Sequence, residues 1–147
     1  MQPDAFERLL HDLLGRLPQH DNVQWLTNTN APDRGRDLSV DRTVDDGTGS
    51  MRTGRVLIQA KHWRSKSVAL PDVQTVLNEA SLSDPRFQVV VIATAGRFTT
   101  DAGALIERCN AECKSPRIEM WPENRLESFL TRYPDLIMVN GLRPAAR

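Results

Sequence analysis

Three residues in the middle of the chain carry side chains suited to metal or acid–base chemistry. Gln59 and Lys61 lie two positions apart in the run VLIQAKHW, residues 56–63, and Asp37 begins the earlier strand-like stretch DLSVD. Because side chains alternate along a strand, Gln59 and Lys61 point to the same face. A lysine on a sheet face that a helix covers is unfavourable unless it is paired or reaches water.

Asp37 can lie beside Gln59 and Lys61 if its strand pairs with residues 56–62. The Asp37 carboxylate, the Gln59 amide oxygen and the backbone carbonyl of Ala60 are hard oxygen donors, which Mg²⁺ prefers while keeping several waters. The Lys61 ammonium could then orient or deprotonate an attacking water, or balance charge that develops on a phosphate. The alternatives are that Lys61 extends past the sheet edge into water, that Gln59 bonds a neighbour, and that Asp37 is a turn residue.

A first helix precedes these strands. Its apolar residues recur at helical spacing from Phe6 to Leu17, Asp4 can cap its start, and Pro18 follows its end. Glu7 falls at the rim of the apolar stripe. Position alone favours a solvated carboxylate that suits the amino-terminal helix dipole.

The remaining elements alternate in type. Strands are expected at 22–29 and 37–41, a hairpin turn at 45–50, and a strand at 56–62. A helix from Leu70 to Ala80, a central strand at 87–94, a helix capped by Thr99 or Thr100, a strand at 117–121 and a last helix stopped by Pro134 follow. This order predicts an α/β fold with a mixed central sheet and helices on both faces.

Length and composition limit the possibilities. The chain of 147 residues suits a single domain, 1–147, in which 140–147 is a tail or the start of a linker. Lys plus Arg equals Asp plus Glu at 19 each, so the net charge does not attract an anionic partner. Such a partner would have to bind a local patch of positive charge. Cys109 and Cys113 are too few for a disulfide framework or a zinc site, which favours a reducing, cytoplasmic location. No membrane span or signal peptide is evident.

Four segments resemble one known family. FERLL, GRDL, IQAKHW and VVVIATAGRFTTDA look like the catalytic domain of Mrr-like restriction endonucleases, in the PD-(D/E)xK nuclease superfamily, from about Phe6 to Phe129. The resemblance implies a restriction-endonuclease-like fold and a site made of Asp37, Gln59, Lys61 and Glu7. Gln-x-Lys in place of Glu-x-Lys is a recurring variant in the Mrr-like group, and it leaves fewer protein charges on the metal.

Candidate DNA-binding residues flank this site. Cations cluster around an indole just after the strand, and an arginine precedes the capped helix, where a phosphate could dock. The residues are His62, Trp63, Arg64, Lys66 and Arg97. The alternative is a solvated loop, and capping alone explains Thr99 and Thr100.

The sequence therefore predicts a Mg²⁺-dependent endonuclease, with Mn²⁺ as a substitute, that hydrolyses DNA in restriction or anti-phage defence. A homodimer or a larger assembly is expected, because cleaving both strands needs two sites and a small neutral domain has little surface for target recognition. The rival prediction is a non-catalytic DNA-binding or assembly module on the same fold. A structure-selective nuclease such as a junction resolvase would use the same residues.

Overall fold

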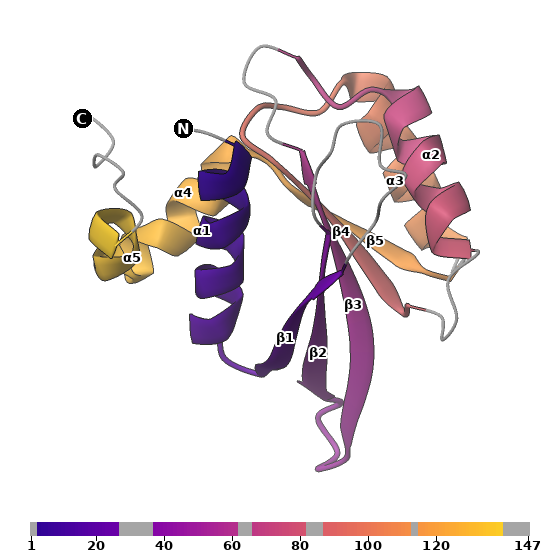
Figure 1. Ribbon diagram of the computed structural model, residues 1–147. Helices are drawn as coiled ribbons and strands as arrows, with labels where there is room; N and C mark the ends of the chain where they lie inside the picture. Colours follow the sequence, from indigo (N-terminus) through magenta and orange to yellow (C-terminus); the bar gives the residue numbers. More distant parts are fainter. Residues whose placement is uncertain (1–2, 27–36, 62–65, 82–86, 113–114, 140–147) are drawn as a thin grey trace.

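The computed structural model describes residues 3–26, 37–61, 66–81, 87–112 and 115–139, and Figure 1 shows them as a sheet between two groups of helices. None of the helices in these ranges has the length and apolar character that crossing a membrane requires. The elements, in chain order, are α1 (Pro3–Arg16), β1 (His20–Leu26), β2 (Asp37–Asp45), β3 (Met51–Lys61), α2 (Leu70–Ser81), β4 (Val89–Thr94), α3 (Thr100–Ala111), β5 (Arg117–Trp121), α4 (Glu123–Arg132) and α5 (Pro134–Val139).

The sheet is mixed, as predicted. Its strands lie in the order β1-β2-β3-β4-β5, with antiparallel pairing from β1 to β3 and parallel pairing from β3 to β5. The predicted hairpin turn between β2 and β3 is confirmed: Asp46 N–H donates to the Ser50 carbonyl at 3.1 Å. Gly47 and Gly49 adopt φ of 84° and 88° there, a region that glycine enters without strain.

Each face of the sheet packs against its own helices (Figure 1). Val56, Ile58 and Ala60 of β3 join the core under α1, α4 and α5, whereas Leu57 joins the core under α2 and α3. The alternation predicted for this strand is therefore confirmed, and Gln59 follows Leu57 onto the α2 face. Cys109 is a buried free thiol in the α2 and α3 core, and Cys113 lies outside the described residues.

Helix boundaries agree with some capping predictions and correct others. Thr99 is the N-cap of α3, and its hydroxyl accepts from Ala102 N–H at 3.1 Å. Asp4 is not a cap, because α1 begins at Pro3 and Asp4 lies inside its first turn. Pro134 ends α4 as expected but also begins α5, since proline suits the first position of a helix.

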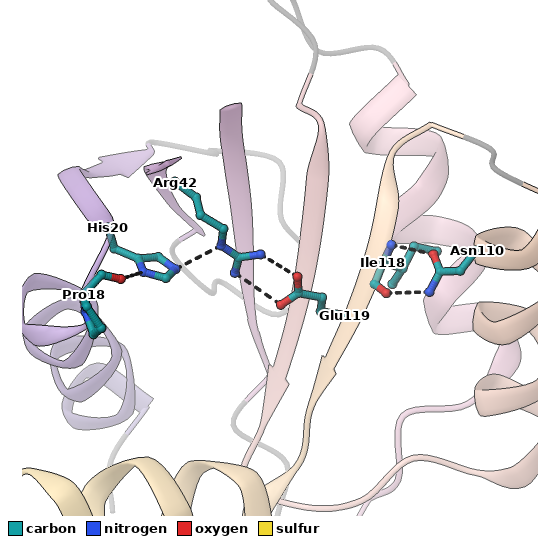
Figure 2. Close-up of polar contacts among 6 residues, drawn as sticks. All are labelled: Pro18, His20, Arg42, Asn110, Ile118 and Glu119. Carbon is teal, nitrogen blue, oxygen red and sulfur yellow. Dashed lines mark hydrogen bonds and ion pairs between the residues drawn. The ribbon is translucent and has the colours of Figure 1, made fainter. Parts of the chain in front are cut away.

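A series of polar side-chain contacts crosses the α1 face of the sheet (Figure 2). Arg42 of β2 binds both carboxylate oxygens of Glu119 on β5, at 2.5 and 3.2 Å, and its Nε donates to His20 Nε2 at 3.0 Å. His20 Nδ1 lies 2.8 Å from the Pro18 carbonyl, so a neutral ring with its proton on Nδ1 satisfies both contacts. Burial is the main cause of a lowered His20 pKa, and the positive charge of Arg42 adds to it against the opposing effect of the Pro18 hydrogen bond.

This geometry predicts a stability loss in mild acid. Folded His20 has a pKa below the ordinary 6.5, so as pH falls below that value the unfolded chain takes up a proton that the folded chain resists. The thermal unfolding temperature should therefore fall between about pH 7 and pH 5 more steeply in the wild type than in His20→Gln. His11→Gln is the matched control, because His11 is stacked on Trp25 outside this chain of contacts. Equal pH slopes for wild type and His20→Gln would contradict the assignment.

The α3 helix protects the outer edge of β5 (Figure 2). The Asn110 side chain accepts from Ile118 N–H and donates to the Ile118 carbonyl, each at 2.9 Å. One side-chain amide thus satisfies two backbone groups of β5 that a further strand could otherwise pair with. Ile118 is only 2% exposed, so these groups are buried.

Asn110→Ala should lower the free energy of unfolding by about 2 kcal/mol, because it leaves buried backbone groups of Ile118 without partners. Chemical denaturation of both proteins measures this difference. Gln74→Ala, which removes an exposed amide from α2, is the control and should change stability by less than about 0.5 kcal/mol. A similar small change for Asn110→Ala would show that the edge contact contributes little.

Candidate active site

The candidate site forms where β2 begins and β3 ends. Leu38 pairs with Ile58, so Asp37 lies opposite Gln59, and alternation turns both side chains to the α2 face. Gln59 Nε2 donates to Asp37 Oδ2 at 2.9 Å. Both residues are buried, with exposed fractions of 8% for Asp37 and 4% for Gln59. The structure thus brings together the acid and the amide that the sequence singled out.

A second carboxylate reaches the same amide from α2. Gln59 Nε2 also donates to Glu79 Oε2 at 3.4 Å, and Glu79 is half-buried. The sequence prediction missed this residue. On a helical projection Glu79 lies about 60° from Val76, at the rim of the α2 stripe, so the sequence did carry a signal that this carboxylate borders the sheet.

Lys61 is the last residue of β3 and is half-buried. It shares the face of Gln59 by alternation and pairs in register with Thr94 of β4. Its carbonyl accepts from Ala95 N–H on the β4 side at 3.4 Å. Because successive carbonyls of a strand point to opposite sides, the Ala60 carbonyl points toward the β2 side, where Asp37 lies.

Glu7 comes from the other helix layer. It lies on α1, which covers the opposite face of the sheet from Gln59. Because α1 runs down to the start of β1, its first turns lie at the end of the sheet where β1 ends and β2 begins (Figure 1). The expectation of a solvated rim position is wrong, since Glu7 is only 5% exposed.

The oxygen donors of this site fit a hard divalent cation. Two carboxylates converge on one nitrogen of Gln59, so its position favours positive charge, and rotating the amide places Oε1 there instead. Asp37, Glu79, the Gln59 amide oxygen and the Ala60 carbonyl are the ligand types that Mg²⁺ takes with waters. Across the described ranges no three His, Cys, Asp or Glu side chains form a metal-binding group, so such a site depends on the amide and carbonyl oxygens as well.

The candidate DNA-binding residues are only partly described. Lys66 and Arg97 are exposed, whereas His62, Trp63 and Arg64 lie outside the described residues. Arg97 lines an open hollow of about 790 Å³ beyond the ends of β4 and β5, together with Met120, Glu123 and Arg125. The Arg97 carbonyl accepts from Val68 N–H at 2.8 Å, which ties the start of α2 to the start of α3.

Comparisons with known proteins agree with this architecture. The fold is similar to that of a solved structure, the DNA modification-dependent restriction endonuclease AspBHI, with a TM-score of 0.59 and 12% sequence identity. The match covers 92% of this chain and 33% of that chain, so the present chain corresponds to about a third of that enzyme. No curated protein sequence matches this chain significantly.

The sequence also matches a family model. The model describes the Mrr-type catalytic domain of restriction endonucleases, and it aligns with residues 1–130. These residues include α1, the whole sheet and the junction of β2 with β3. The chain therefore belongs to the Mrr catalytic domain family of restriction endonucleases.

Proposed function

We propose that this chain is a Mg²⁺-dependent endonuclease that hydrolyses DNA phosphodiester bonds, and that Mn²⁺ can substitute. The observation that carries the proposal is the contact between Asp37 and Gln59 at the β2 and β3 junction, with Lys61 on the same strand face. Membership of the restriction endonuclease family supports nuclease activity.

Asp37 and Gln59 would hold the ion, together with the Ala60 carbonyl. The register of β2 against β3 fixes both side chains, because Leu38 and Ile58 are fully buried on the opposite face. When bound, Mg²⁺ supplies Lewis-acid chemistry, which activates the attacking water and stabilises charge on the phosphoryl oxygens. Burial of the two ligands strengthens these electrostatic interactions.

Lys61 would act on the phosphate side of the site. Its position at the end of β3 would let the ammonium extend past the strand end toward the sugar–phosphate backbone of bound DNA. There it would donate hydrogen bonds to the nucleophile and to a phosphoryl oxygen as negative charge develops in the transition state. Glu7 would support the site as a further carboxylate from α1, directly or through water.

Target choice would come from outside this domain. The net charge of zero gives no general attraction to DNA, so exposed cations such as Lys66 and Arg97 would neutralise phosphates locally. AspBHI is three times as long as the part that matches this chain, which supports a role for this chain as one module of a larger or dimeric restriction system. Such a module would act in restriction or anti-phage defence in the bacterial cytoplasm.

Cleavage of supercoiled plasmid tests the proposal. In Mg²⁺ or Mn²⁺ at low salt the wild type should nick or linearise the plasmid, and EDTA should abolish this activity. Asp37→Asn and Lys61→Met should each lower the cleavage rate by about 10²-fold or more, since each removes a group that acts on the transition state. Asp45→Asn is the matched control, because Asp45 lies on the same strand at the far hairpin.

Two outcomes of the plasmid assay would contradict the proposed nuclease site. Salt-sensitive plasmid binding without cleavage, at both low and raised protein concentration, would favour a non-catalytic module on this fold. Equal cleavage by wild type and Asp37→Asn would place the nuclease site elsewhere. Comparing linear duplex with a four-way junction would separate a general endonuclease from a junction resolvase.

A further inference from the structure

Gln59 leaves the proposed metal site short of negative charge. An amide oxygen is a neutral ligand, so Asp37 would be the negatively charged group that β2 brings to Gln59 and to a doubly charged ion. A hard cation bound by one carboxylate and neutral oxygens is held weakly unless another carboxylate contributes.

We propose that Glu79 of α2 is the second carboxylate ligand of this site, and that it supplies the negative charge that the neutral Gln59 amide does not. Glu79 Oε2 and Asp37 Oδ2 contact the same nitrogen of Gln59, at 3.4 and 2.9 Å. An ion near that nitrogen would touch both carboxylates after they close in by roughly 1 Å, given Mg²⁺–oxygen distances of about 2.1 Å. The proposal rests on the metal-dependent function proposed above.

The position of Glu79 on α2 supports this role. Val73, Val76 and Ala80 anchor the helix in the core, with exposed fractions of 3% or less, and they hold the neighbouring Glu79 toward the sheet. Gln74, on the far side of the same helix, is exposed. Glu79 is half-buried beside the buried carboxylate of Asp37, so two acidic groups lie within reach of one cation.

Gln59 would then have two states. Without an ion its amide nitrogen lies between the two acids and stands in for positive charge. With an ion, rotation of the amide turns Oε1 inward, so the same side chain becomes a neutral third ligand. Gln59 is 4% exposed, which keeps this exchange away from bulk water.

Metal binding to the full chain, measured by titration calorimetry with Mn²⁺, tests the proposal. Glu79→Gln, which keeps the side-chain shape, should weaken Mn²⁺ binding at least about tenfold and slow plasmid cleavage. Thermal unfolding without metal should show unchanged stability, because glutamine keeps the side-chain shape and an oxygen that can accept from Gln59 Nε2. A purely structural role for Glu79 predicts the reverse, lower stability with unchanged Mn²⁺ affinity.

A charge exchange strengthens the test. Adding Gln59→Glu to Glu79→Gln should restore Mn²⁺ affinity, because a carboxylate returns to the same ion from β3. Glu107→Gln, at an exposed position on α3, is the control and should bind Mn²⁺ as the wild type does.

Two negative outcomes are distinguishable. If Asp37→Asn loses Mn²⁺ affinity while Glu79→Gln keeps it, Glu79 is not a ligand and the nuclease proposal stands. If the wild type neither binds Mn²⁺ nor cuts plasmid at raised protein concentration, the proposed function fails and the assignment of Glu79 fails with it.

Discussion

The pairing of β2 with β3 is the constraint on which the candidate site depends. The register that sets Leu38 against Ile58 also sets Asp37 against Gln59, and it sends the apolar pair to one face and the polar pair to the other. A slip of one residue in this pairing would turn either Leu38 or Ile58 out of the core under α1. The apolar packing of one face therefore fixes the polar geometry of the other, although no apolar residue takes part in the proposed chemistry.

The polar pair also depends on the helix that covers it. Asp37 and Gln59 are buried, and buried polar groups cost free energy unless they are hydrogen-bonded. Their mutual hydrogen bond and the contact with Glu79 reduce this cost, while α2 is held in place by Val73 and Val76. The result is a pair of acidic side chains held beside a buried amide, and these are the types of oxygen donor that Mg²⁺ binds.

Local patterns in the sequence predicted the fold well. The placement of Gln59 and Lys61 on one face of β3 follows from the alternation of side chains along any strand, and the continuous apolar run in β4 is typical of a strand that is covered on both faces. The junction of Asp37 with Gln59 followed from the hairpin at Gly47 and Gly49, because a tight turn pairs the two strands that it joins along one edge.

Features that depend on three-dimensional packing were not predictable in the same way. Pro134 was expected to stop a helix, but whether another helix follows depends on the burial of Leu136 against distant residues. The burial of Glu7 depends on how closely α1 approaches the sheet, which helical spacing does not fix. Arg42 and Glu119 lie 77 positions apart, on strands that do not pair with each other, so no sequence spacing joins them.

The charge of the proposed site also constrains how DNA would approach it. Asp37 and Glu79 repel a phosphate when no cation is present, and the net charge of zero supplies no compensating field. Lys61 lies on the same strand face as Gln59, and Arg97 is exposed beyond the ends of β4 and β5. A divalent ion would remove this repulsion and supply the attraction, so in the proposed function it would be required for productive DNA binding at the site as well as for hydrolysis.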